Sequence, residues 1–351
     1  MKKEKQLSQS ILRKRLRKFK SIKRGYYSLW IIVILYILAE LTPILITNKP
    51  LLVRYNEEFY FPLAKAYSAS TFGVESHGEP NYRELDKIFA EQDGNWAIMP
   101  LYPYHPNESL LSELSPNVPP TAPTFQHLFG TDNRGRDVFA RLVYGFKYSI
   151  RFAIIVTTIS YILGIIVGAT LGFFGKKIDI LGQRIIEIFS SIPFLFMIII
   201  IRESLKEPPG FLGLAFILSA FGWMGMTYYI RGEFYREKAK DYVSAAVSMG
   251  ASNRQVMFKH ILPNALTPVI TFAPFAIVGA IFSLVSLDFL GFGLVPPTPS
   301  WGEIANQGIS EFRYWLIGAP MLATFTTLLL ITFIGEAIRE AFDPKVYSRL
   351  R

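Results

Sequence analysis

Six apolar runs, each about as long as a membrane-spanning helix, dominate this sequence. A helix needs about 20 residues to cross roughly 30 Å of hydrocarbon. Because the bilayer core contains no water, each run must satisfy its own backbone hydrogen bonds, which a helix does. The sequence therefore predicts an all-α integral membrane protein with six transmembrane helices, at 27–47, 148–174, 178–201, 211–230, 268–287 and 315–334.

The charged residues are distributed so that they orient these helices. Residues 1–26 carry eleven basic residues against one acid, directly before the first run, whereas 48–131 holds ten acids and five bases. Positively charged flanks remain on the cytoplasmic side, so both termini are predicted to be cytoplasmic. A cleaved signal peptide is the alternative for the first run, but no small-residue cleavage site follows it. Nucleic-acid binding by the tail is not expected, because a membrane anchor already accounts for the charge.

This orientation divides the chain into consecutive parts. The segment after the first run is too long for a connector and is rich in proline, tyrosine and acidic residues. We expect it to form a small extracytoplasmic cap, with short strands or turns and little helix. The predicted parts are a basic tail at 1–26, a first helix at 27–47, an outer insert at 48–147, a five-helix core at 148–339 with a cytoplasmic loop at 231–267, and a cytoplasmic tail at 340–351.

The loop between the fourth and fifth runs predicts two short helices. Gly250 permits the left-handed turn that ends the first of them, and Ser252 or Asn253 then caps the second. Ala245 and Ala246 provide a small-residue face that another surface can approach closely. We also expect a proline at 263 to end the second helix before the fifth run.

The spacing within this loop resembles the "EAA" loop of ABC importer permeases. Ala-Ala is followed by Gly four residues later, and Ile-Leu-Pro begins eleven residues after that Gly. In that family the loop forms the coupling helix, which sits in a groove on the cytoplasmic ATPase. This sequence departs from the motif in having Ser where Glu is frequent. The positions to which the resemblance assigns ATPase docking are Ser244, Ala245, Ala246, Gly250, Ile261, Leu262 and Pro263.

Two further motifs lie at the predicted outer face. Gly-Thr-Asp-Asn-Arg-Gly-Arg-Asp at 130–137 matches the "GTDxxGRD" signature of the peptide and nickel permease group. Ser-Leu-Asp-Phe-Leu-Gly-Phe-Gly-Leu at 286–294 is similar to the outer loop of the same group. Both read physically as capped turns, so we expect structural roles for Gly130, Thr131, Asp132, Gly135, Arg136, Asp137, Asp288, Gly291 and Gly293.

Segments at 48–55, 60–63 and 335–344, together with the long insert, resemble the Yej-type branch of peptide permeases, which serves an importer of microcin C and other peptides. The resemblance implies the type I ABC importer permease fold, in a bacterial inner membrane, with alternating access driven by a separate ATPase subunit. The implied partners are a homologous second permease, a cytoplasmic ABC ATPase, an extracytoplasmic solute-binding protein, the lipid bilayer and a peptide-like substrate. A dipeptide, oligopeptide or nickel permease is the alternative within this class.

Acidic residues within the runs are candidates for function, because charges at membrane depth are costly. Glu40 lies near the outer end of the first run and is positioned to reach the interface. Glu187 follows Arg184 by three residues, which predicts a local ion pair. Asp288 lies beside a glycine-rich break, where it can cap backbone donors. Small residues at four-residue spacing favour close helix contact, and the second run carries such a series at Gly164, Gly168 and Gly172.

Several other functions lack the residues that they need. The histidines His77, His105, His127 and His260 are scattered, without metal-ligand spacing. No phosphate-binding Gly-x-x-x-x-Gly-Lys-Ser/Thr sequence is present, so we expect this chain to bind no cofactor, with ATP and Mg²⁺ on the partner ATPase. An intramembrane enzyme would need a nucleophile and base at membrane depth, and none is evident. A channel or structural protein would not need the Ala-Ala to Ile-Leu-Pro loop.

Overall fold

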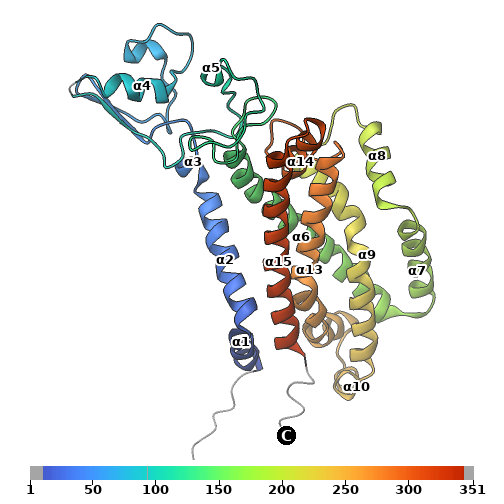
Figure 1. Ribbon diagram of the computed structural model, residues 1–351. Coiled ribbons are helices and arrows are strands. Elements are labelled where there is room, and N and C mark those ends of the chain that lie inside the picture. Colours follow the sequence, from blue (N-terminus) through green and yellow to red (C-terminus); the bar gives the residue numbers. More distant parts are fainter. Residues whose placement is uncertain (1–10, 93, 344–351) are drawn as a thin grey trace, which may run out of the picture.

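The computed structural model describes residues 11–343 apart from residue 93. Residues 1–10 of the predicted basic tail and 344–351 of the predicted C-terminal tail therefore lie outside the described residues. Long helices form a bundle, and a small cap lies at one end of it (Figure 1). Four of these helices are long and apolar enough to cross a membrane, namely α6 (Val138–Phe174), α9 (Phe211–Lys238), α13 (Thr267–Phe289) and α15 (Tyr314–Phe342).

Two bent helix pairs complete the set of apolar segments. The first pair, α1 (Ile11–Ser21) and α2 (Lys23–Glu40), bends by 93°, and α3 (Thr42–Leu45) follows it. The second pair, α7 (Lys176–Ser190) and α8 (Phe194–Ser204), bends by 77°. Counted as one span each, these pairs bring the described residues to the six spans that the sequence predicts.

The run at 178–201 was predicted as one continuous helix, and the structure breaks it. The break lies at 191–193, between α7 and α8, and ends at Pro193. Proline has no N–H for a helical hydrogen bond, and it disfavours helical geometry at the residue before it. A single proline in an otherwise apolar run thus turns a predicted straight span into two helices.

α6 packs closely against α9 through three glycines of α6. A Cβ added to Gly168 would lie 2.7 Å from the Thr227 carbonyl oxygen, and one added to Gly172 would lie 2.6 Å from Phe234 Cβ. A Cβ on Gly164 would meet the Trp223 carbonyl oxygen at 2.8 Å. The close helix contact predicted from the glycine spacing is confirmed.

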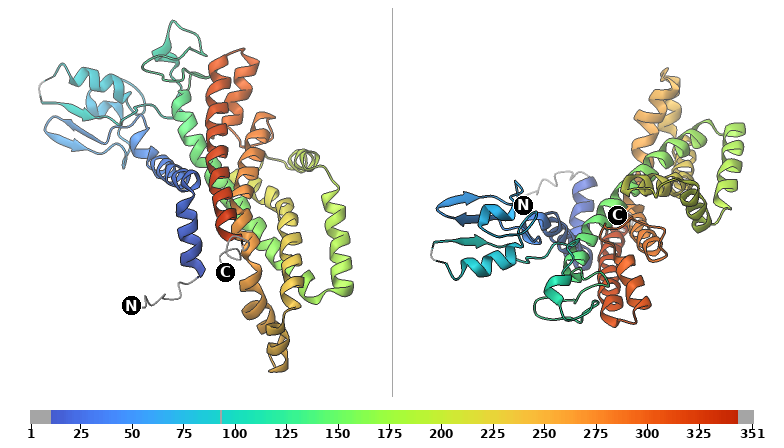
Figure 2. Two further views of the ribbon diagram at one scale, coloured as in Figure 1. Left: turned by 60° about the horizontal axis from the view of Figure 1, so that its bottom comes forward. Right: turned by 90° about the horizontal axis from the view of Figure 1, so that it is seen from above.

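The cap is a mixed α and β unit, as predicted for the insert. Its three-stranded antiparallel sheet has the order β2 (Glu58–Tyr60), β1 (Leu52–Tyr55), β3 (Trp96–Ile98), with Val53 opposite both Tyr60 and Ala97. The cap and its sheet lie beyond α2, on the side away from the bundle (Figure 2). The cap also contains short helices at η1 (Ala69–Phe72), α4 (Tyr82–Phe89) and α5 (Leu111–Leu114). Its core is formed by Val53, Phe72, Tyr82, Leu85 and Phe89.

An arginine joins the two halves of the cap. Arg83 Nη2 lies 2.8 Å from Glu108 Oε1 and 2.5 Å from Glu113 Oε1, and its Nη1 donates to the Pro103 carbonyl at 2.6 Å. Burial alone would raise the pKa of the Glu113 carboxyl. The hydrogen bonds and charge of Arg83, with a bond from Asn81, outweigh burial and hold that pKa below its ordinary value.

We expect the cap to lose stability in acid, and Arg83→Met to move that loss to higher pH. A carboxyl with a lowered folded-state pKa stabilises the fold above its unfolded pKa of about 4, and that stability is lost as pH falls through the folded pKa. Without Arg83, burial remains and raises the pKa of Glu113. Trp96 fluorescence during acid titration measures the midpoint. An unchanged midpoint in Arg83→Met would contradict this assignment, and Lys49→Met, on an exposed pair with Glu79, is the control.

Candidate functional site

The loop between α9 and α13 folds into a projecting coupling segment, which we define as residues 241–265. It comprises α10 (Asp241–Ser248), α11 (Asn253–Gln255), the π-helix η2 (Val256–Ile261) and α12 (Leu262–Ala265). α10 lies beyond the end of α9, at the end of the bundle opposite the cap (Figure 1). Gly250 has a φ of 86°, as the predicted left-handed turn requires.

The second half of the coupling segment is capped by Ser252. Its side chain accepts from Gln255 N at 3.3 Å, and the Gln255 side chain accepts from Ser252 N at 2.9 Å, which is a capping box. The prediction that Pro263 ends this helix is wrong. Pro263 occupies the first turn of α12 instead, where a missing N–H costs no hydrogen bond.

A polar contact ties the coupling segment to α9. Glu237, near the end of α9, accepts from Lys240 Nζ at 2.6 Å and from the Tyr242 hydroxyl at 2.9 Å. Asn264 then donates to the Tyr242 oxygen at 3.3 Å, which joins α10 to α12. Beneath these bonds, Val243 packs in an apolar cluster with residues of α6, α9 and η2. These contacts attach the segment to the end of α9.

Some of the residues predicted to dock the ATPase are exposed, and others are buried. Ser244, Ala245, Gly250 and Pro263 are exposed, and Leu262 is half-buried. Ala246 and Ile261 are 2% and 0% exposed, so they hold the shape of the segment and do not offer a contact.

Two exposed apolar side chains at the tip of the coupling segment were not predicted from the sequence. Val247 is 56% exposed and Met249 is 81% exposed. No sequence signal marks Val247, because it lies four residues after buried Val243 and helical spacing alone would place the two on the same face. Met249 lies in the turn that follows α10.

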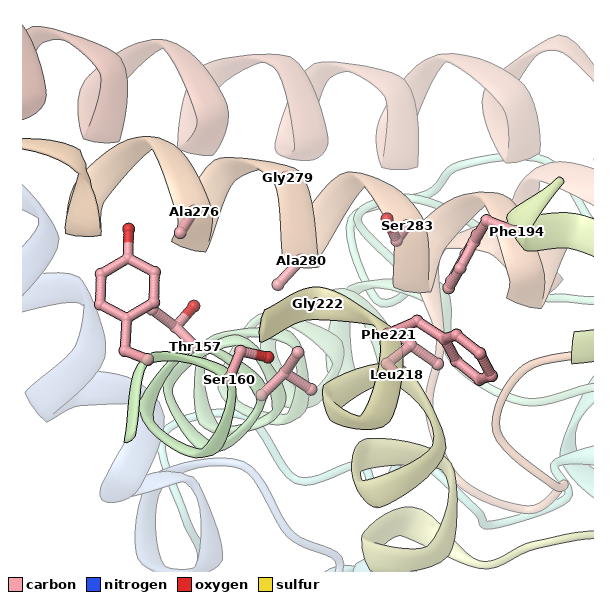
Figure 3. Close-up of a pocket in the computed structure, with 12 residues that line it drawn as sticks. Thr157, Ser160, Phe194, Leu218, Phe221, Gly222, Ala276, Gly279, Ala280 and Ser283 are labelled. Atoms are coloured by element: carbon pink, nitrogen blue, oxygen red, sulfur yellow. The ribbon is translucent and has the colours of Figure 1, made fainter. Parts of the chain in front are cut away.

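A pocket of about 290 Å³ lies inside the membrane-spanning region, between α6, α8, α9 and α13 (Figure 3). The hydroxyls of Thr157 and Ser160, which are 8% and 4% exposed, have no hydrogen-bond partner among the described residues. A Cβ on Gly222 would lie 2.6 Å from Ser160 Oγ, so glycine leaves room beside this hydroxyl. The lining carries no charge and comprises Val156, Thr157, Ser160, Tyr161, Phe194, Leu218, Phe221, Gly222, Ala276, Gly279, Ala280 and Ser283.

The 130–137 signature forms part of an outer ion cluster, which we define as Asp132, Arg136, Arg141 and Glu303. Arg136 Nη2 lies 2.6 Å from Asp132 Oδ2 and 3.1 Å from Glu303 Oε1. Arg141 Nη2 lies 2.6 Å from Glu303 Oε2, and the Arg141 side chain is fully buried. The cluster joins the start of α6 to α14 (Trp301–Ser310).

Asp137, the last residue of the signature, begins α6. Its Oδ1 accepts from Ala140 N at 2.8 Å, which caps the helix. Its Oδ2 accepts from the Tyr102 hydroxyl at 2.8 Å and lies 2.9 Å from His127 Nδ1. The signature glycines bend the chain, since Gly130 and Gly135 have φ values of 70° and 71°.

Asp288 organises the second outer motif. Its carboxylate accepts from Leu294 N and from Ser300 Oγ, each at 2.6 Å. A Cβ on Gly293 would lie 1.8 Å from Asp288 Oδ1, so any other residue there would displace the carboxylate. Gly291 has a φ of 80° and ends the turn after α13. Asp288 thus closes the loop that leads into α14.

The other two acidic residues singled out in the spans are paired. Glu187 lies 2.6 Å from Arg184 on the same helix, and both are exposed. Glu40 pairs with Arg151 of α6 and lies 3.7 Å from Lys147 Nζ. The Glu40 partners were missed because they lie over 100 residues away along the chain, in an otherwise apolar run. Among the described residues, no group of three His, Cys, Asp or Glu side chains could hold a metal ion.

Comparison with known proteins decides the family. The model of the family described as "Binding-protein-dependent transport system inner membrane component" matches residues 146–348, more than half of the chain. This chain belongs to that family. The match includes the coupling segment, the membrane pocket and α13 to α15. The permease is therefore an inner-membrane, non-catalytic transport subunit, and the predictions of an ABC permease fold and of no enzyme activity are confirmed.

Individual relatives indicate which branch of the family this permease resembles. It is 38% identical to the inner membrane ABC transporter permease protein YejE of Escherichia coli K12, over 93% of this chain and 95% of that protein. It is 36% identical to the peptidoglycan transport system permease protein YejE of Agrobacterium fabrum, over 95% and 93%. The oligopeptide transport system permease protein OppC of Haemophilus influenzae is 36% identical, over 65% of this chain and 74% of that protein. The predicted resemblance to Yej-type permeases is confirmed.

Membership also defines the kinds of partner with which this permease works. A binding-protein-dependent ABC system contains a solute-binding protein and an ABC ATPase besides its membrane component. The intramembrane enzyme and the channel considered from the sequence are therefore set aside.

Proposed function

We propose that this permease takes up peptides or peptide-like compounds by alternating access, driven by an ATPase that docks on the coupling segment. The names of its YejE and OppC relatives, which cite peptidoglycan and oligopeptide transport, support this substrate class. The greater coverage by YejE proteins favours the Yej type over the dipeptide, oligopeptide or nickel alternative. A substrate of the microcin C type follows from that resemblance and stays a prediction.

We further propose that both termini and the coupling segment are cytoplasmic. The excess of basic residues at 1–26 and of acidic residues at 48–131 supports this orientation. In Figure 1, α1 and the C-terminal end of α15 lie at the same end of the bundle as α10. ATP and Mg²⁺ then bind to the partner ATPase, and no cofactor binds to this chain.

One observation carries the mechanism: the helices that hold the coupling segment also line the membrane pocket. α9 joins α10 through the Glu237 contacts and contributes Phe221 and Gly222 to the pocket. α13 follows α12 and contributes Ala276 and Gly279. A displacement of α10 by an ATPase would therefore move two walls of the pocket together.

The chemistry of the membrane pocket suits a peptide pathway. Its hydroxyls can exchange hydrogen bonds with neutral amides, while the uncharged lining avoids the strong binding that would retain a solute.

We propose that a homologous second permease covers the open side of this pocket, and that the paired subunits enclose the pathway. A solute-binding protein delivers the solute at the outer face.

Docking is tested by Met249→Asp in cells that contain the native partners. Met249 is 81% exposed, so the substitution should leave the fold intact while placing a charge in an apolar contact. We expect the wild-type chain to co-purify with an ABC ATPase and the variant to lose at least about nine-tenths of it, a cost of ~1.4 kcal/mol or more. Leu101→Asp, at an 85% exposed position in the cap, is the control. Equal ATPase recovery with both variants would contradict docking at this tip.

The pathway is tested by Ser160→Cys, since the natural sequence has no cysteine. We expect a small, membrane-impermeant thiol reagent to modify this cysteine in the assembled transporter, and transported peptide to slow the modification severalfold. Ser219→Cys is the matched control, because Ser219 is 1% exposed and lies outside the pocket. If the two cysteines react equally slowly in an actively transporting complex, the pocket is not part of the pathway.

A further inference from the structure

The short helix α1 is the most basic element that the structure describes. It carries six basic residues, at 13, 14, 15, 17, 18 and 20, and no acid. The mechanism proposed above uses none of them. The positive-inside rule accounts for the sign of the charge, but it does not account for a folded helix with a fixed orientation.

One face of α1 is docked against the inner end of α15. Lys18 Nζ lies 2.8 Å from Glu340 Oε1, and the Arg15 guanidinium carbon lies 4.5 Å from the centre of the Phe342 ring. At the corner between α1 and α2, Arg24 pairs with Glu336 at 3.0 Å. These contacts fix the rotation of α1 about its axis, so its other face is defined.

Away from its contacts with α15, α1 is basic and exposed. Lys14, Arg17 and Lys20 are all exposed, and the structure gives them no ion pair or hydrogen bond within residues 11–343. Leu16, which is 52% exposed, lies among them. This face therefore combines uncompensated positive charge with an apolar side chain, the pattern of an interfacial helix.

The bend places this face at the membrane surface. α1 turns by 93° from α2, and α2 forms most of the first span. If α2 crosses the bilayer, α1 lies along the headgroup layer. In Figure 1, α1 and α10 lie on either side of the lower end of α15, and α10 extends farther from the bundle. The ATPase-docking tip is thus separated from this basic face.

We propose that the exposed face of α1 binds the headgroups of anionic phospholipids and so fixes the inner ends of α2 and α15 at the membrane surface. Ammonium and guanidinium groups at an interface attract anionic lipid headgroups. The Lys18 pair of α1 and the Arg24 pair of α2 transmit this anchoring to α15. Lipid binding by this face does not depend on which solute is transported.

The test is a lipid-quenching measurement on the full chain. A fluorophore is attached to the cysteine of Ser21→Cys, in a chain that otherwise has none, and the protein is reconstituted in bilayers. Quenching by spin-labelled phosphatidylglycerol is compared with quenching by spin-labelled phosphatidylcholine. We expect a preference of about fivefold or more for phosphatidylglycerol, which weakens as salt is raised.

Matched variants separate the α1 face from total charge. Lys14→Gln with Arg17→Gln and Lys20→Gln is expected to abolish the preference at the Ser21→Cys label. Lys176→Gln with Lys177→Gln and Arg184→Gln removes the same charge at α7 and should leave the preference unchanged. Equal quenching by both lipids in the wild-type background would overturn the proposal. A second result would also overturn it: the α1 triple variant loses the co-purified ATPase, while the wild-type chain shows no lipid preference. That result would assign the face to a protein partner.

Discussion

Glu303→Ala is expected to destabilise the permease by about 3–5 kcal/mol, because it removes one partner of a buried ion pair. Arg141 is fully buried and its Nη2 lies 2.6 Å from Glu303 Oε2. Without Glu303, the nearest carboxylate to Arg141 is Asp132, at 3.7 Å from its Nε. Arg136 would lose its second partner at the same time.

Unfolding of the detergent-solubilised chain by heat or denaturant measures this loss. Glu187→Ala is the control, since it breaks an exposed pair and should change stability by about 0.5 kcal/mol or less. The double variant Arg141→Met with Glu303→Leu should recover most of the lost stability, because apolar residues can replace a buried pair without leaving a charge alone. A Glu303→Ala variant as stable as Glu187→Ala would show that the outer ion cluster does not hold α6 to α14.

Gly168→Ala is expected to cost about 1–3 kcal/mol and to reduce assembly with partners, because it separates α6 from α9. The added Cβ would lie 2.7 Å from the Thr227 carbonyl oxygen and 2.9 Å from Ile230 Cβ. Both contacts involve the inner half of α9, which carries the coupling segment. A shift there would also disturb the link from α10 to the membrane pocket.

Gly232→Ala on α9 provides the matched control. A Cβ at position 232 meets nothing within 4 Å, so this change should be neutral or stabilise the helix by up to about 1 kcal/mol. Thermal unfolding and ATPase co-purification of the two variants, compared side by side, give the result. Equal stability of Gly168→Ala and Gly232→Ala would contradict the close approach of α6 and α9.

The sequence predicts features that depend on local chemistry. Apolar runs of span length identify the membrane helices, and the Gly250 turn follows from the conformational freedom of glycine. The 130–137 motif was expected to be a capped turn, and Asp137 caps α6. In each case the decisive interaction lies within a few residues of the chain, so the local pattern is sufficient.

Features that depend on distant partners were not predictable in the same way. α6 begins at Val138, ten residues before the predicted span. The predicted span began too late because Arg141 and Lys147 lower the apolar character of the first turns of this helix. Their partners, Glu303 and Glu40, lie on other elements and make those charges tolerable. The membrane pocket likewise needs side chains from four helices, and the exposed tip at Met249 appears only once the face of α10 that is buried is known.

ATP-driven movement of the coupling segment is expected to carry a peptide through this permease. Uptake of a labelled peptide into proteoliposomes tests it most directly, with the complete native complex, the binding protein outside and ATP inside. We predict ATP-dependent accumulation with the wild-type chain and its loss with Met249→Asp. Peptide accumulation that persists without ATP, or in Met249→Asp when the ATPase is absent from the complex, would contradict the account.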